Sequence, residues 1–86
     1  MASYSLEIKR SAAKELARRP KPGCARVTAR IQALAHDPRP VGSEKLSGQE
    51  RYRVRQGDYR ILYEVKDDVL IVTVVQVGHR HEGYRR

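Results

Sequence analysis

The residues best suited to chemistry in this chain are basic side chains gathered in two short stretches. The first holds Arg51, Arg53, Arg55 and Arg60, and the second holds His79, Arg80, His81, Arg85 and Arg86. A guanidinium group fits phosphate oxygens with two parallel hydrogen bonds and stays charged at physiological pH. Residues of these types are therefore suited to binding phosphate and to stabilising negative charge that develops on it.

The whole chain shares this positive bias. Its 86 residues include 18 Lys and Arg against 10 Asp and Glu, which gives a net charge of +8 and a pI near 10.2. A small domain with such an excess usually meets a polyanion, and nucleic acid is the commonest one. Two plainer explanations stay open, namely that the charge only keeps the protein in solution or that it binds an acidic protein.

Several classes of protein are disfavoured by composition. One cysteine, Cys24, cannot build a disulfide framework or a cysteine-based metal site. No set of His, Cys and Asp residues has metal-ligand spacing, and no glycine-rich loop precedes a helix to hold a nucleotide, so we expect no metal and no small-molecule cofactor. No apolar run approaches the ~20 residues of a membrane span, and no signal segment is visible at the N-terminus. We expect a cytoplasmic protein without a membrane partner.

The first half of the chain predicts one strand and two helices within a single domain, residues 1–86. Polar and apolar residues alternate over residues 3–8, which places Tyr4, Leu6 and Ile8 inward in a strand. Ser11 is suited to cap a first helix, which Pro20 ends. Pro22 suits the first turn of a second helix, which ends at Asp37-Pro38. The apolar stripe of that helix is Cys24, Val27, Thr28, Ile31, Leu34 and Ala35. A loop is expected over residues 38–50.

The second half predicts a sheet. Strands over residues 52–56 and 59–66 flank Gly57-Asp58, a pair suited to a two-residue hairpin turn. Asp67-Asp68 is expected to turn the chain into a last strand over residues 69–77. The fold class is therefore α+β, in the order β-α-α-β-β-β, with a helical hairpin packed on one face of an antiparallel sheet.

The hairpin turn predicts a register with consequences for function. It pairs Arg55 with Arg60, and it places Arg53 on the same face. The helix-covered face would then hold Tyr52, Val54, Ile61, Tyr63 and Val65. Like charges directly opposite each other destabilise a sheet, so this arrangement favours an anion as ligand. We also expect Leu62, Ile71 and Val75 on the open face, as a surface for an amphipathic partner segment.

Three segments, residues 45–48, 52–65 and 77–85, resemble the RelE/ParE toxin superfamily, as does the order of elements. Arg80 and Tyr84, four residues apart, favour its ribonuclease branch, RelE. The resemblance implies a RelE-like fold and a metal-independent endoribonuclease that cleaves mRNA in the ribosomal A site, inhibiting translation. It implies as partners the ribosome, mRNA and a cognate RelB-like antitoxin.

The resemblance also implies roles for single residues, because relatives use basic side chains and a tyrosine in place of a conventional acid–base pair. The catalytic set falls on Arg55, Arg60, Arg80 and Tyr84, and the RNA-binding set on Lys45, Arg51, Arg53, His79 and His81. Some relatives have lysines at positions 53 and 55, and arginine effectively cannot release a proton as lysine can. His79 or His81 is a substitute proton carrier, although a histidine in a basic loop is more often simply solvated.

Two other functions compete with the ribonuclease. A ParE-like toxin would share the fold and the basic sheet but would inhibit DNA gyrase without nuclease activity; it would not account for Arg80 and Tyr84 together. A plain RNA- or antitoxin-binding module would have no catalysis at all. An adjacent gene for a short acidic partner would favour either toxin. Expression of the protein would then distinguish the two toxins. The ribonuclease would arrest translation, whereas the gyrase inhibitor would cause DNA damage.

Overall fold

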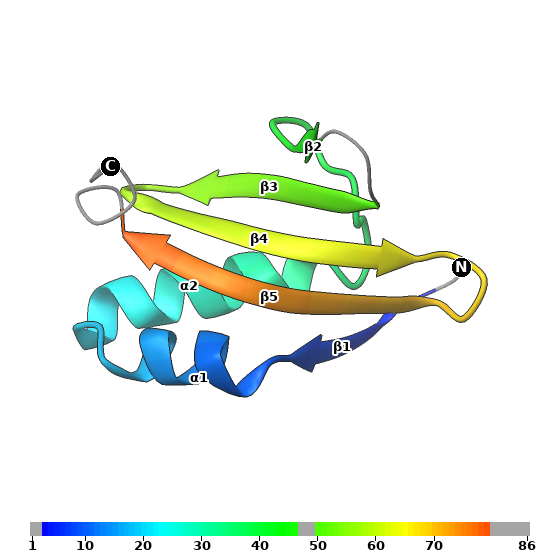
Figure 1. Cartoon of the computed structure of the whole chain (residues 1–86). Coiled ribbons are helices and arrows are strands. Elements are labelled where there is room, and N and C mark those ends of the chain that lie inside the picture. Colours follow the sequence, from blue (N-terminus) through cyan, green and yellow to red (C-terminus); the bar gives the residue numbers. More distant parts are fainter. Residues whose placement is uncertain (1–2, 47–49, 80–86) are drawn as a thin grey trace.

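The computed structural model describes residues 3–46 and 50–79. Within these ranges the chain forms two helices and a five-stranded sheet (Figure 1). The elements in chain order are β1 (Ser5–Ile8), α1 (Arg10–Ala17), α2 (Lys21–Ala33), β2 (Glu44–Leu46), β3 (Arg51–Gln56), β4 (Tyr59–Lys66) and β5 (Ile71–His79). The predicted order β-α-α-β-β-β is confirmed, with one short strand, β2, inside the expected loop.

The strands lie in the order β1-β5-β4-β3-β2. Pairing is antiparallel except between β1 and β5, which run parallel. The expectation of a purely antiparallel sheet is therefore wrong at one edge. After the helical hairpin, residues 34–46 lead the chain back to the sheet. Strand β1 pairs with β5, the last strand, and not with β2, the next strand along the chain. Backbone hydrogen bonds from Ser5 N to Leu70 O (2.8 Å) and from Lys9 N to Val74 O (2.9 Å) hold β1 in place.

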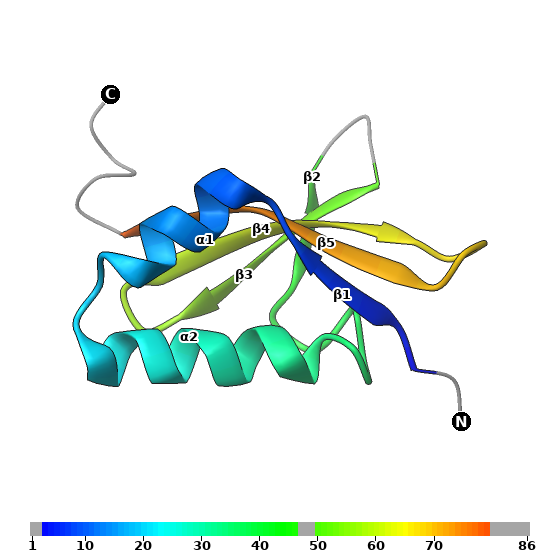
Figure 2. The ribbon, with the colours of Figure 1, turned by 90° about the horizontal axis from the view of Figure 1, so that it is seen from below.

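The helices begin where local backbone rules allow. The N-cap of α1 is Lys9, with no side-chain cap, so the expected capping role of Ser11 is wrong and Ser11 lies inside the helix. For α2 the N-cap is Pro20, and Pro22 falls in the first turn as predicted, where a missing N–H costs nothing. Figure 2 shows α2 along one face of the sheet and α1 beside the C-terminal half of β5.

The hydrophobic core lies between the helices and this face of the sheet. The residues predicted to face inward from β3 and β4 are all buried, namely Tyr52, Val54, Ile61, Tyr63 and Val65. They are joined by Ala12 and Leu16 of α1, by Val27 and Ile31 of α2 and by Leu34 just after it. Tyr63 is fully buried and donates a hydrogen bond from its hydroxyl to the carbonyl of Pro38 (2.7 Å), which anchors the loop after α2. Of the expected inward residues of β1, Tyr4 and Leu6 pack against this core, whereas Ile8 is exposed.

The β4–β5 connection differs from the predicted two-residue turn. It takes the four residues 67–70, with Leu70 in the left-handed region (φ 56°), so β5 begins at Ile71 instead of Val69. A bulge follows, because Leu62 pairs with Gln76 whereas Tyr63 pairs with Val74. Val75 is the extra residue, and it lines a hollow against Ser11 and Glu15 of α1.

Candidate functional site on the open face of the sheet

The face of the sheet opposite α2 gathers the arginines of the first basic stretch. Arg55 of β3 is the register partner of Arg60 of β4, and Arg53 pairs with Leu62. Opposed residues in an antiparallel pair project to the same face, so Arg53, Arg55 and Arg60 share the open face. The predicted hairpin register is confirmed. Two guanidinium groups are thereby held on adjacent strands by backbone pairing.

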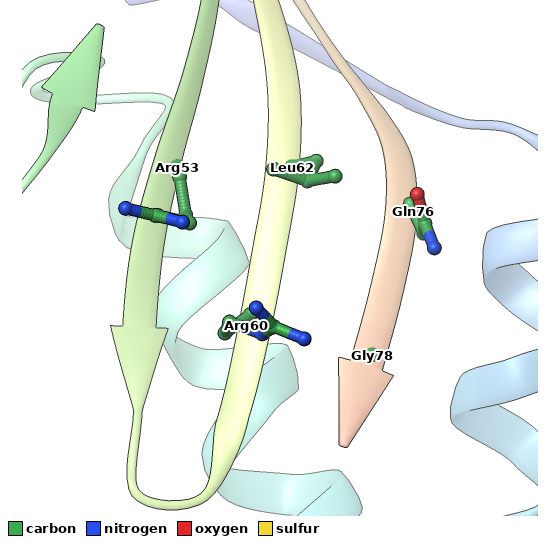
Figure 3. A pocket seen from close by; sticks show the side chains of 5 residues that line it. All are labelled: Arg53, Arg60, Leu62, Gln76 and Gly78. Atoms are coloured by element: carbon green, nitrogen blue, oxygen red, sulfur yellow. The ribbon is translucent and has the colours of Figure 1, made fainter. Parts of the chain in front are cut away.

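A hollow of about 110 Å³ lies between these side chains, lined by Arg53, Arg60, Leu62, Gln76 and Gly78 (Figure 3). Arg60 pairs with Gly78, which has no side chain to fill the space opposite the guanidinium. Leu62 provides an apolar surface and Gln76 an amide at the far wall. Two cations beside an apolar surface suit a phosphate joined to a sugar or a base.

Internal carboxylates occupy some of the arginines. Arg51 Nε donates to Glu64 Oε2 at 3.0 Å, and Arg53 forms an ion pair with Glu44 of β2. Arg55 is exposed and makes no hydrogen bond or ion pair to any residue in ranges 3–46 and 50–79. Arg55 is therefore the cation of this face most available to an external anion.

Glu44 is a residue of the site that sequence reasoning missed. Strand β2 sets it directly opposite Arg53, and the sequence signal for this strand is only three residues long. The hydrogen bond from Arg53, and then its charge, lowers the pKa of the Glu44 carboxyl. A carboxylate with a lowered pKa is a weak base, so this geometry suits Glu44 to holding Arg53 in position.

Lys45 and His79, both expected to bind RNA, lie away from the hollow. Lys45 pairs in register with buried Tyr52, on the other face, and its ammonium lies 3.5 Å from Glu50. His79 pairs with Tyr59 and packs edge-on against that ring, with 5.1 Å between centroids. Both residues are register partners of tyrosines that pack on the helix-covered side, and alternate residues of a strand point to opposite sides.

The expected residues Arg80, His81 and Tyr84 lie outside the residues that the structure describes. Strand β5, the last element that the structure describes, ends at His79, one residue after the partner of Arg60.

A hydrogen-bond network braces the other end of the sheet. Arg39 donates from both terminal nitrogens to Asp67, at 3.3 and 2.7 Å, and from Nε to the Tyr52 hydroxyl at 2.9 Å. The Tyr4 hydroxyl also donates to Asp67, at 2.6 Å. The hydrogen bonds from Arg39 and then from Tyr4 lower the pKa of the Asp67 carboxyl. The hydrogen bond between Tyr4 and Asp67 also raises the pKa of the Tyr4 hydroxyl. This network ties β1, the loop after α2 and the β4–β5 turn together.

Metal and membrane chemistry find no support in the part of the chain that the structure describes. No group of three or more His, Cys, Asp or Glu side chains there is arranged to hold a metal ion. None of its helices combines the length and the apolar character needed to cross a membrane.

Comparison with known proteins places this architecture among bacterial and archaeal toxins. Residues 6–84 match the model of a family described as the ParE toxin of type II toxin–antitoxin systems, parDE. Toxin RelG of Mycobacterium tuberculosis is 36% identical over 56 residues, and this match spans 62% of each chain, less than two thirds of RelG.

Solved structures agree with this placement. The archaeal RelE–RelB complex of Pyrococcus horikoshii OT3 contains a chain with a TM-score of 0.84 and 27% identity, covering 98% of this chain and 99% of that one. The RelBE2 toxin–antitoxin complex of M. tuberculosis gives a TM-score of 0.82 and 25% identity, covering 93% and 94%. The predicted resemblance to the RelE/ParE superfamily and the predicted RelE-like fold are confirmed.

Proposed function

The chain belongs to the ParE toxin family of type II toxin–antitoxin systems, within the RelE/ParE superfamily, and on that premise we propose that it is a toxin that cuts RNA. We infer that it is a ribosome-dependent endoribonuclease that cleaves mRNA in the ribosomal A site and thereby inhibits translation in the cytoplasm. The observation that supports this most is the pairing of Arg55 with Arg60 beside a hollow of the open face.

The proposed reaction needs no metal ion. The ribose 2′-oxygen attacks the adjacent phosphorus, a bond forms between them, and the bond from phosphorus to the 5′-oxygen breaks. The 2′-hydroxyl gives its proton to a base, and the departing 5′-oxygen takes up a proton. The products are a 2′,3′-cyclic phosphate and a 5′-hydroxyl. The transition state carries extra negative charge on the phosphorus oxygens, and this charge is what fixed cations stabilise.

The described arginines suit this task by position. Arg60 lines the hollow, and Arg55 is the register partner of Arg60 on the neighbouring strand. Both residues are therefore assigned to the scissile phosphate. Arg53, held by Glu44, is assigned to the RNA backbone beside it. Each guanidinium remains charged throughout, so these residues bind and stabilise charge while the protons move elsewhere.

Proton transfer is assigned to the segment that follows β5. Arg80 is proposed to assist the leaving 5′-oxygen and Tyr84 to orient the 2′-hydroxyl or to stack on a base. His79 is turned toward Tyr59, so His81 is the better histidine candidate for a base. Lys45 and His79 stay in the proposal only as peripheral contacts to the ribosome or to RNA outside the hollow.

We propose that a RelB-like antitoxin is the protein partner. The two solved relatives above are toxin–antitoxin complexes. A net charge of +8 on this chain favours a partner with acidic segments. Leu62 at the centre of the open face offers an apolar contact among the arginines.

The test is primer extension on a defined mRNA, with and without programmed ribosomes. Wild type is compared with Arg60→Gln, Arg80→Ala and Tyr84→Phe, after each variant is shown to fold by circular dichroism. We expect cleavage in the A site that requires ribosomes and falls steeply in all three variants. If ribosome-dependent cleavage is unchanged in Arg60→Gln, the reaction does not take place in the hollow. No cleavage by folded wild type would refute the nuclease.

The match to the ParE family favours a second candidate, inhibition of DNA gyrase without nuclease activity. The open basic face would then contact gyrase or its DNA. A supercoiling assay with purified gyrase distinguishes the two. Inhibition of supercoiling together with intact mRNA would establish this candidate in place of the first.

A further inference from the structure

A second and larger hollow lies on the other side of β3 from the first. It measures about 390 Å³ and is lined by Arg30, Gly42, Glu44, Arg53 and Arg55. Arg30 comes from the last turn of α2, and the others come from β2, β3 and the loop before β2. Three guanidinium groups against one carboxylate give this hollow an excess of positive charge.

The fold leaves this hollow open because β2 is short. Strand β2 pairs only with residues Arg51–Arg53 of β3, so β3 is an uncovered edge from Val54 onward. Arg55 stands on this uncovered part. Arg53 lines both hollows, which makes them neighbours across a single strand.

Arg30 has hydrogen-bonding capacity to spare. Its Nε is buried and has no hydrogen-bond partner among the residues that the structure describes. Arg30 also lies close enough to Tyr63 to lower the pKa of that hydroxyl, although burial raises it overall. Because Arg30 also lines the hollow, its guanidinium is placed to bind an anion that enters from the edge.

We propose that Arg30 forms a second phosphate subsite in this hollow, so that single-stranded RNA crosses β3 with adjacent phosphates in the two hollows. This inference rests on the proposed function and adds the path of the substrate to it. Neighbouring strands of a sheet lie ~4.8 Å apart, a spacing that one nucleotide step of a single strand can bridge. Arg53, between the two hollows, contacts the backbone that joins the two phosphates.

The experiment measures what a second phosphodiester adds to binding. Non-cleavable 2′-O-methyl oligonucleotides with one and with two phosphodiesters are titrated into the full chain by calorimetry at several salt concentrations. Wild type is expected to bind the longer oligonucleotide several-fold more tightly. Arg30→Gln is expected to lose most of this gain and to show a shallower salt dependence, by about 0.7 in the logarithmic slope.

Two further variants keep the test sharp. Arg18→Gln removes the same charge from the exposed end of α1, where Arg18 lies 3.6 Å from Glu15, and it is expected to behave as wild type. Arg30→Lys keeps the charge and is expected to keep part of the gain. If Arg30→Gln does not fold, Arg30→Met takes its place, because it removes the charge and keeps an unbranched stem that packs near the core.

The outcomes separate this inference from the proposed function. A wild type that cleaves RNA, with Arg30→Gln indistinguishable from Arg18→Gln, overturns the second subsite and leaves the ribonuclease standing. If Arg30→Gln weakens only the binding of the antitoxin and keeps the gain from the second phosphodiester, the hollow belongs to the protein partner. This outcome also overturns the second phosphate subsite. A wild type that neither binds nor cleaves RNA overturns both.

Discussion

Arg55 and Arg60 are register partners on β3 and β4, and their guanidinium groups project to the same open face. Two like charges so placed destabilise the sheet by about 0.2–1 kcal/mol. The fold therefore places two mutually repelling guanidinium groups beside the hollow of the open face. An anion bound between them would relieve this repulsion.

The first prediction concerns this pair. Arg55→Gln is expected to raise the free energy of unfolding by about 0.2–1 kcal/mol, because the repulsion disappears. Added phosphate should raise the Tm of wild type more than that of the variant, because an anion stabilises the form that binds it. Denaturant titration and thermal melts measure both effects. A variant less stable than wild type, with an unchanged response to phosphate, would contradict the account.

The second prediction concerns Gly78, the partner of Arg60. A Cβ placed there meets no atom within 4 Å, so Gly78→Val should fold and should gain about 0.5–1 kcal/mol from replacing a strand glycine. Its side chain would fill the hollow, and cleavage should fall by about tenfold or more. Thr73→Val, on the same strand and opposite Glu64, is the control. Full activity of Gly78→Val would show that substrate does not enter this hollow.

The third prediction concerns the carboxylate beside Arg53. Glu44→Gln should tighten RNA binding by about fivefold at most, because the carboxylate no longer competes with phosphate for Arg53 and exposed ion pairs are weak. Cleavage should change little. A loss of about 100-fold or more in single-turnover cleavage, with RNA binding intact, would instead identify Glu44 as the general base.

The fourth prediction concerns the packing of α2 against β4. A Cβ at Gly23 would lie 2.6 Å from the Tyr59 hydroxyl oxygen. Gly23→Ala gains about 1 kcal/mol of helix propensity, whereas the overpacking costs about 1–3 kcal/mol, so a net loss of stability is expected. Tyr59→Phe removes the closest atom and should recover part of the loss in a double-mutant cycle. Additive effects of the two substitutions would rule out the contact.

The fifth prediction concerns pH. Arg39 and Tyr4 lower the folded-state pKa of Asp67, so its contribution to stability is complete above the unfolded-state pKa. That contribution is lost as the pH falls through the lower folded-state value. Between about pH 7 and pH 2, wild type should therefore lose more stability than Asp67→Asn. Asp68→Asn, whose carboxylate has no hydrogen bond or ion pair in the described ranges, should lose as much as wild type. Parallel curves for all three proteins would contradict the role of Asp67.

Local patterns in the sequence determined the two helices, the β3–β4 hairpin and the face that carries Arg53, Arg55 and Arg60. The reason is that a two-residue turn sets a hairpin register within a few residues, and the side-chain period of two then assigns every face. The same reasoning identified the buried side of β4, and the residues of three segments carried the resemblance to the superfamily.

Only the tertiary structure decided which distant residues meet these arginines. Strand β2 is too short to be recognised from three residues, yet it brings Glu44 to Arg53. The parallel pairing of β1 with β5, the bulge at Val75 and the approach of Arg30 to β3 depend on packing between segments far apart in the chain. Local propensity carries no information about such contacts, because their stability comes from the burial of surfaces that exist only once the sheet and helices have assembled.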